Sequence, residues 1–507
     1  MLKRVPYVLL VVGALALATP APLPGQTLAE FEKRVSEYTL GNGMKFIIVE
    51  RHKVPVVSFH LYADVGSVND QVGQTGLAHV FEHMAFKGTS TIGTKNIQKE
   101  KRALARVDQA YAAWQGERRQ GERADPERLK QLAAAFQKAQ EEAEQYIVNG
   151  EYDQAIEQAG GVGLNATTSS DATRYFFSLP SNKLELWFSL ESARFFDPVL
   201  RQFYKERDVV IEERRLSRES QPIGRLIDEF LSVAYKAHPY GRSNIGWRSD
   251  LENLTRQHGK EFFGTYYTPR NLTAVIVGDV NAQQVIRLAK LYFGRIPAGP
   301  TPEPLWTVEP RQEGERRTTV VAQSQPILVI GYHKPSIRHP DNAVFAAVQD
   351  ILSAGRTSRL YRRLVQEKKL AVFAGGFPGF PGEKYPNLFL FLSVAAAEHT
   401  NEENEEAMLG ELERLKTELV TAEELSRAKR RARAQLVRQL DSNSGLASQL
   451  AFYHVVTSDW RNLFRQLEAI ANVTREDIQR VARTYFTQRN RTIAYLVPET
   501  PVQSGKQ

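Results

Sequence analysis

The sequence contains no cysteine among its 507 residues. It therefore has no disulfides, no thiolate metal ligands, no cysteine nucleophile and no cysteine for lipid attachment. With 42% hydrophobic and 24% charged residues, the composition is that of a globular chain rather than a disordered one. A chain of this length can be stable through burial of a core alone, and it is long enough for two or more domains.

The apolar run near the N-terminus is too short to cross a bilayer. Residues 5–18 follow Lys3 and Arg4, and a run of about 14 residues falls short of the ~20 that a membrane-spanning helix needs. The pattern predicts a signal peptide and leader over residues 1–26, with Ala16 to Ala18 as a cleavage candidate. We therefore expect an exported protein, in bacteria a periplasmic one, without a stable membrane anchor after cleavage.

The charge excess of the chain is modest. The formal net charge is +8, and removal of Lys3 and Arg4 with the signal peptide lowers it to +6. Such an excess predicts no nucleic-acid partner, because solubility or attraction to acidic peptides is enough to explain it.

One short segment combines three groups that can bind or activate a metal. Residues 75–88 contain the motif His79-x-x-Glu82-His83. At about 100° per residue these side chains share one arc of a helix, and the remaining positions are apolar. We expect Thr75 to cap this helix and Gly88 to end it.

The residue types in this motif point to zinc chemistry. Two imidazoles four residues apart can share one zinc ion, and zinc lowers the pKa of water bound to it. Glu82, on the same arc, can accept the proton of that water. Two histidines at this spacing alone would more often arise by chance or be packed in a core than bind a metal. A carboxylate between them on an otherwise apolar helix favours a metal site, because burying three unpaired polar groups costs several kcal/mol. A third ligand has to come from elsewhere.

The remaining pattern predicts alternating sheet and helix segments. Residues 37–49 read as two strands around an Asn42-Gly43 turn, and residues 54–65 as a further strand. Residues 98–158 read as an inserted, charged helical hairpin with a break at 121–126. Residues 160–168 are expected to form a loop before a strand at 174–179, and residues 182–235 to be rich in helices.

An internal duplication divides the chain. Residues 265–277 match residues 484–496 at an offset of 219, and a weaker match sets the metal-binding helix against residues 346–351 at an offset of 268. The second copy has Ala347 and Ile351 at the histidine positions, so it is not expected to bind metal. A proline-rich stretch, residues 297–304, separates the copies.

These observations predict an α+β fold of two homologous domains, each a largely antiparallel sheet with helices, forming half of a clamshell. We expect an N-terminal domain at 30–295, a linker at 296–317 and a C-terminal domain at 318–500.

Two adjacent glutamates compete to be the third ligand. In residues 205–216, Glu206 and Glu213 lie seven apart and share a helix face with Val209, Val210 and Leu216. Glu212 points instead toward Asp208 and Arg215, as expected of a solvated acidic residue. We therefore prefer Glu213 as the ligand.

With these residues in place, the chain resembles the inverted-zincin peptidases, the family of pitrilysin, insulinase and mitochondrial processing peptidase. The resemblance extends beyond the His-x-x-Glu-His motif and the distant glutamate. It includes Asn165-Ala-Thr, His238-Pro-Tyr-Gly, Tyr267-x-Pro-x-Asn-Leu and the duplication.

The resemblance implies a role for each residue of the site and one zinc ion per chain. It implies zinc binding by His79, His83 and Glu213, proton transfer by Glu82, support of the site by Glu206, and pairing of substrate backbone with an edge strand at Asn165, Ala166 and Thr167.

One departure from the family pattern bears on the partner. The C-terminal domain of many members carries an Arg and a Tyr, seven residues apart, that hold the substrate, and the aligned positions here are Val365 and Val372. We expect a zinc endopeptidase for unfolded peptides that forms the catalytic subunit of a two-subunit enzyme. The partner would be a homologous subunit with the Arg/Tyr pair, although a homodimer is possible. Alternatives are a non-catalytic scaffold or processing partner of the same family, and a zinc-storage protein.

Overall fold

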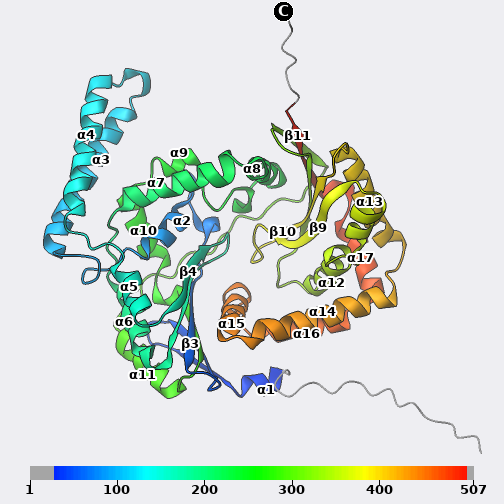
Figure 1. Cartoon of the computed structure of the whole chain (residues 1–507), viewed down its shortest axis with the longest axis horizontal. Coiled ribbons are helices and arrows are strands. Elements are labelled where there is room, and N and C mark those ends of the chain that lie inside the picture. Colours follow the sequence, from blue (N-terminus) through cyan, green and yellow to red (C-terminus); the bar gives the residue numbers. More distant parts are fainter. Residues whose placement is uncertain (1–27, 500–507) are drawn as a thin grey trace, which may run out of the picture.

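The computed structural model describes residues 28–499, so the predicted signal peptide lies outside the described residues. Two mixed β-sheets with covering helices stand on opposite sides of the molecule (Figure 1). The α+β fold expected from the sequence is confirmed.

The first sheet positions the candidate site. Its strands run in the order β1-β2-β6-β3-β5-β4, and only β2 and β6 are parallel neighbours. The predicted Asn-Gly turn joins β1 to β2, with Gly43 at φ +95°, a conformation that glycine adopts without a Cβ clash. The strand bounds are β1 Val35–Thr39, β2 Lys45–Glu50, β3 Val56–Ala63, β4 Val162–Thr168, β5 Thr173–Pro180 and β6 Leu272–Gly278.

The interpretation of residues 160–168 as a loop is wrong for most of its length. Residues 162–168 form β4, which pairs with β5 and lies at the edge of the sheet. Glycines at 160, 161 and 163 weakened the strand signal, since glycine is depleted in strands. The pairing with β5 supplies the order that the local sequence does not indicate.

The second sheet repeats the arrangement of the first. Its order is β7-β11-β8-β10-β9, with β7 and β11 parallel, which matches β2-β6-β3-β5-β4 strand for strand. Asn271 donates to the carbonyls of Asp64 and Tyr266, and Asn490 donates in the same way to His333 and Tyr485. The strands are β7 Arg316–Ala322, β8 Ile327–Lys334, β9 Ala371–Phe380, β10 Asn387–Ala395 and β11 Arg491–Pro498.

Each half lends a helix to the sheet of the other. Helix α15 packs on β3 and β6, where Leu446 and Leu450 share a core with Val275 and Val277. Helix α8 packs on β7 and β11, where Phe230 contributes to a second shared core. The two halves are therefore held together by apolar cores rather than by the linker alone. Residues 297–315 form neither helix nor strand, and the domain boundaries themselves stay predictions.

Helices make up most of the remaining regular structure in the described chain, and none of them is long and apolar enough to cross a membrane. The first half holds α1 Leu28–Glu32, α2 Leu77–Met84, α6 Leu184–Phe196, α7 Phe203–Arg214, α8 Pro222–Ala234, α9 Arg248–Leu251, α10 Arg256–Tyr266 and α11 Ala282–Tyr292. The second holds α12 Asn342–Ser353, α13 Asn401–Thr417, α14 Ala422–Asp441, α15 Asn443–Thr457, α16 Asn462–Asn472 and α17 Arg475–Tyr485.

A helical hairpin forms within the predicted segment 98–158, but its paired helices end at Glu144 and residues 151–158 form a separate helix. Helices α3 (Ile97–Arg118) and α4 (Pro126–Glu144) pair and project from the first half, and α5 (Glu151–Gln158) leads the chain back to β4 (Figure 1). Asp125 caps α4 by accepting from the backbone N–H groups of Glu127 and Arg128, with Pro126 in the first turn.

Candidate metal centre

Helix α2 carries the His-x-x-Glu-His motif on a buried apolar body. Leu77, Ala78, Val80, Phe81 and Met84 are all buried, as the periodicity predicts. The apolar face fixes the helix against the first core. The polar stripe is thereby held in one orientation, and His79 and His83 keep side-chain exposures of 12% and 24%.

The start of α2 differs from the prediction. The N-cap residue is Gly76, with φ +89°, and the side chain of Thr75 is hydrogen-bonded to Asp250 instead. The N–H groups at the start of the helix have no partner within the helix. The buried carboxylate of Asp70 accepts hydrogen bonds from two of them, those of Gly76 and Ala78. Local spacing does not reveal this cap, because Asp70 lies seven residues before the helix.

The turn after α2 is held by a residue that the sequence did not single out. The helix ends at Met84, before the expected stop at Gly88, whose φ of +83° lies in the turn that follows. Arg201 is 1% exposed, and its guanidinium donates to the carbonyls of Lys87, Thr89 and Ile92. This arginine fixes where the chain leaves the site.

Helix α7 delivers the two glutamates. The predicted exposure of Glu212 is confirmed, since it pairs with Arg215 at 2.6 Å on the surface. The expectation that Val209 and Leu216 share the buried face is wrong, because these side chains are 47% and 53% exposed. The buried face of α7 is rotated from the predicted one and consists of Phe203, Tyr204, Glu206, Arg207, Val210 and Arg214.

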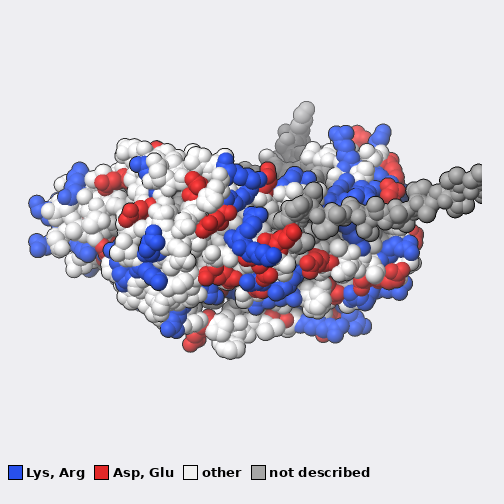
Figure 2. All heavy atoms as spheres, turned by 90° about the horizontal axis from the view of Figure 1, so that it is seen from below, with Lys and Arg blue, Asp and Glu red and all other residues white. Residues whose placement is uncertain are grey.

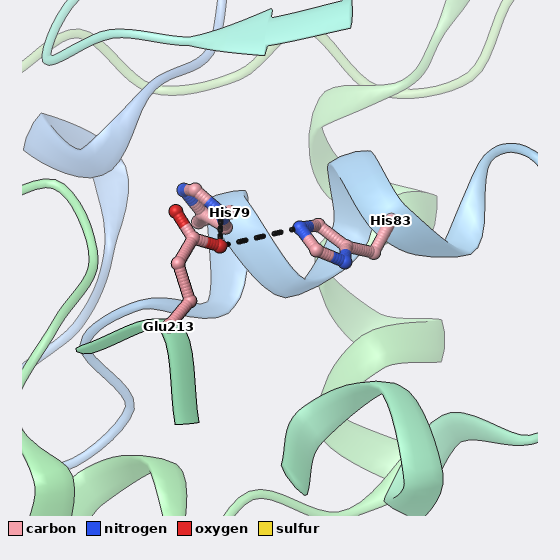
Figure 3. Close-up of side chains that lie close together, drawn as sticks. All are labelled: His79, His83 and Glu213. Carbon is pink, nitrogen blue, oxygen red and sulfur yellow. Dashed lines mark hydrogen bonds and ion pairs between the residues drawn. The ribbon is translucent and has the colours of Figure 1, made fainter. Parts of the chain in front are cut away.

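Three potential ligands converge between α2 and α7. The Nε2 atom of His79 lies 3.1 Å from Oε2 of Glu213, and Nε2 of His83 lies 3.7 Å from the same oxygen. One ligand atom from each residue lies within 4.8 Å of the other two. Both histidines extend from one side of α2 toward the carboxylate (Figure 3). In the described residues this is the one cluster with metal-binding geometry.

Glu206 supports the second histidine. Its Oε2 lies 3.5 Å from Nδ1 of His83, and its Oε1 is 2.7 Å from Nζ of Lys87. The contact to Nδ1 leaves Nε2 of His83 turned toward Glu213. A carboxylate on the outer nitrogen orients a metal-binding histidine and raises its basicity. Lys87 was not anticipated from the sequence.

The donor set fits a zinc ion. Two imidazole nitrogens and one carboxylate oxygen are the protein ligands of many catalytic zinc sites, in which the fourth position stays open. A buried acceptor beside them is unsatisfied, since Oε2 of Glu82 has no hydrogen-bond partner within the described part of the chain. Native proteins rarely leave such an atom unpaired unless it has a functional role or binds an ion or water.

Electrostatics couple the ligands before metal binds. Burial lowers the pKa of His79, but the carboxylates of Glu213, Glu82 and Asp70 together outweigh burial and raise the pKa above its usual value, with Glu213 contributing most. The hydrogen bond from His79 in turn outweighs burial and lowers the pKa of Glu213. Burial raises the pKa of Glu206, yet His83 and Lys87 together lower it overall. Both glutamates are therefore charged at neutral pH.

The contact between Glu206 and His83 predicts a partial rather than a complete loss of zinc affinity when Glu206 is replaced. We expect Glu206→Gln to weaken zinc binding by about 10–100-fold, the usual cost of losing an outer carboxylate partner of a zinc histidine. Competition with a zinc chelator, followed by metal analysis, measures the change. An unaltered zinc affinity would contradict the supporting role. Glu212→Gln is the matched control on the exposed face of α7.

The predicted substrate-binding residues lie on an edge strand beside the site. Strand β4 contacts α2 and is the last strand of its sheet. Asn165 and Thr167 retain solvent exposure, whereas Ala166 is buried. In register these residues oppose Phe176, Tyr175 and Arg174 of β5, so the other edge of β4 is not paired within the described residues. The role of Asn165, Ala166 and Thr167 in holding substrate stays a prediction.

Comparison with known proteins identifies the family. Residues 45–114, which contain the motif of α2, match the family described as "Insulinase (Peptidase family M16)", and residues 253–432 match "Peptidase M16 inactive domain". The chain belongs to the M16 peptidase family. The second match begins before the proline-rich stretch and ends within α14.

Several M16 relatives match over almost the full chain. "Zinc protease PqqE" of Helicobacter pylori is 29% identical over 470 residues, covering 91% of this chain and 92% of that protein. The beta subunit of the mitochondrial-processing peptidase of Saccharomyces cerevisiae is 22% identical, covering 82% and 81%.

Solved M16 structures share the fold. A Helicobacter pylori protease matches with a TM-score of 0.76 at 28% identity, covering 92% of this chain and 99% of that one. The periplasmic protease PqqL of Escherichia coli matches with a TM-score of 0.68 at 17% identity, and the match spans 49% of PqqL. This M16 chain therefore has the size of a half-enzyme.

In the second half of this M16 chain, helix α12 corresponds to α2 but carries apolar residues at the positions of the two histidines. Ala347 and Ile351 on α12 are 1% and 4% exposed and belong to the apolar core between the second sheet and its helices. These two positions therefore contribute to the apolar core of the second half.

Proposed function

We propose that this chain is a zinc-dependent endopeptidase that acts on unfolded peptides within a chamber closed by a second, related subunit. The observation that supports it most strongly is the convergence of His79, His83 and Glu213 beside the unpaired carboxylate of Glu82. A scaffold or a storage protein has no need for a half-buried acid with one buried, unpaired oxygen beside the ligands, because that acid costs stability without contributing a ligand.

Each side chain has a distinct part in the proposed reaction. A zinc ion held by His79, His83 and Glu213 would supply Lewis-acid chemistry and lower the pKa of water. Glu82 accepts the proton of the attacking water and returns it to the leaving amine. Glu206 holds His83 in position. Strand β4 offers its unpaired edge to an extended peptide, so that selection depends on backbone conformation more than on side chains.

The proposed need for a partner rests on two valines. Val365 is half-buried, and Val372 at the start of β9 is 58% exposed, so neither offers a polar group to a substrate. A shift in alignment does not restore the pair, because Arg362 and Arg363 have Lys369 and Leu370 seven residues further on. We propose that the related subunit supplies the missing arginine and tyrosine, and that both are exported, as the periplasmic relative PqqL suggests.

Grafting the pair tests the split site. We expect the purified chain alone to cleave an unfolded peptide slowly, and Val365→Arg with Val372→Tyr to raise kcat/KM at least about tenfold, since one oxyanion donor contributes about 10²–10³-fold. Val365→Arg with Val372→Phe is the matched control without the hydroxyl. The idea fails if the unmodified chain alone already turns over at an ordinary enzymatic rate, about 1–10³ per second. The zinc peptidase assignment would survive that result.

A further inference from the structure

A large cavity lies on the underside of the molecule, apart from the metal centre. Its volume is about 720 Å³, which is in the range of small-molecule sites. It is bounded by α1 and the β2–β3 turn of the first half and by α14, α15 and α16 of the second, which lie together at the bottom of the fold (Figure 1). None of the residues of the metal centre lines it.

The floor of this cavity is apolar. Phe31 and Phe464 are buried and their rings lie 4.8 Å apart, while Leu440 and Leu467 are half-buried. Two further buried leucines complete the floor, Leu436 and Leu446. A hydrocarbon chain laid on this surface would remove apolar area from water on both sides, at about 25 cal/mol per Å².

The rim of this cavity is cationic. Within the described residues no carboxylate oxygen lies within 4.0 Å of a charged nitrogen of the rim residues. These residues are Arg34, Arg51, Lys53, Lys429 and Arg430. The guanidinium of Arg51 donates to the carbonyls of Leu440 and Asp441. Burial and the neighbouring charge of Arg34 lower the pKa of Arg51. The two guanidinium groups thus repel each other, and the carboxylate of Asp441 offsets this repulsion only in part.

Three acidic residues also line the rim, Glu50, Asp441 and Glu468. Glu50 accepts from the backbone N–H of Ala282 and lies 3.7 Å from His52. Asp441 and Glu468 are exposed. On the part of the underside that Figure 2 shows in colour, basic and acidic side chains lie side by side. The cationic character is therefore a local property of the rim rather than of a continuous basic face.

From this combination we infer that the cavity is a binding site for a single-chain amphiphilic anion, that is, a free long-chain carboxylate. Its alkyl chain lies along the leucine and phenylalanine floor, and its carboxylate meets Arg51, Lys429 and Arg430. The volume suits one acyl chain better than a helix of a protein partner, whose diameter with side chains is about 10–12 Å. The mixed charges of the surrounding face do not favour an anionic membrane.

The site joins the two halves of the chain, so its occupancy has a measurable consequence. Its walls belong to α1 and β2 on one side and to α14 and α16 on the other. A ligand that binds only when these walls are together stabilises the folded chain by mass action. We therefore expect the carboxylate to raise the melting temperature as well as to bind. Neither readout depends on zinc or on peptidase activity.

Calorimetric titration of the full mature chain with dodecanoate, below its micelle concentration, tests the inference. We expect one site per chain and a rise in melting temperature, with dodecyltrimethylammonium binding at least about tenfold more weakly because its head repels the rim. Equal binding of the cationic amphiphile, or many weak sites, would overturn the proposal. So would binding confined to phosphatidylglycerol vesicles or to poly-glutamate, which would indicate a membrane or an acidic protein segment instead.

Charge reversal locates the site. Lys429→Glu with Arg430→Glu should weaken dodecanoate binding at least about tenfold, since two attractive charges become repulsive. Lys101→Glu with Arg102→Glu makes the same change at an adjacent, exposed Lys-Arg pair on the projecting hairpin and should leave binding unaltered. An equal loss in both variants, or none in the first, would refute the assignment. Melting curves without ligand establish that both variants fold.

Discussion

Replacing Glu82 by glutamine is expected to abolish peptide hydrolysis while zinc stays bound. The substitution keeps the shape of the side chain and removes only its ability to accept a proton. General acid–base catalysis contributes about 10²–10⁴-fold, so we expect kcat/KM for an unfolded peptide to fall by that factor. Glu82 is not among the three converging ligands, so metal analysis should still find near-stoichiometric zinc.

The assay for this variant has to include the conditions under which the parent is active. The grafted chain with arginine at 365 and tyrosine at 372, or the chain with its partner, provides that background. Glu212→Gln is the control, since Glu212 pairs with Arg215 on the outer face of α7 and contacts no ligand. Retention of parental activity in Glu82→Gln would refute the proposed proton transfer. Loss of zinc in the same variant would instead indicate that Glu82 takes part in binding.

Local periodicity was enough to predict the core of the site. The spacing of His79, Glu82 and His83 defines one arc of a helix whatever the helix packs against, and the apolar residues between them define the buried side. Spacing also separated Glu212 from Glu213, since neighbours on a helix differ by about 100° in direction. These predictions required only the geometry of a single element.

Features of the site that depend on contacts between different helices and turns could not be predicted from local periodicity. Asp70 caps α2 across a turn, and Arg201 reaches the carbonyls after α2 from the start of α7. The direction of the buried face of α7 was predicted wrongly. Val209 and Leu216 were expected on that face, but Arg207 and Arg214 are buried there instead. Arg214 is accommodated by an ion pair with Asp228 at 2.9 Å, and no local pattern reveals such a partner.

The two halves share a fold, but the candidate ligands lie in the first half alone within the described residues. Asn271 and Asn490 make equivalent backbone contacts, so the closing strand is held in the same way in both copies. Helix α12 occupies the place of α2, but its alanine and isoleucine contribute to a core. The second half has thus kept the structural residues and lacks the ligands. Its apolar surfaces instead bind the first half, through α8 and α15.

Replacing Glu213 by glutamine should remove zinc binding altogether. An amide is a poor ligand for zinc in this position, and the loss should exceed the about 10–100-fold expected for the outer carboxylate of Glu206. Glu212→Gln, one residue earlier on the same helix, should bind zinc like the parent. Dialysis against a buffered zinc solution and metal analysis of the three proteins measure the difference. Equal zinc content in Glu213→Gln and the parent would exclude Glu213 as a ligand.

The same ligand pair sets the pH dependence of zinc binding. Burial lowers the pKa of His79, but Glu213, with smaller contributions from Glu82 and Asp70, raises it above its usual 6.5. At lower pH its imidazole therefore carries a proton that zinc has to displace. Glu213, with a pKa below its usual 4.5, stays ionised throughout that range. Zinc affinity should therefore rise as pH increases through the pKa of His79. In Glu213→Gln the carboxylate that raises this pKa is gone, so NMR titration of the metal-free variant should show His79 losing its proton at lower pH than in the parent. An unchanged titration would mean that the 3.1 Å contact between His79 and Glu213 is not formed in solution.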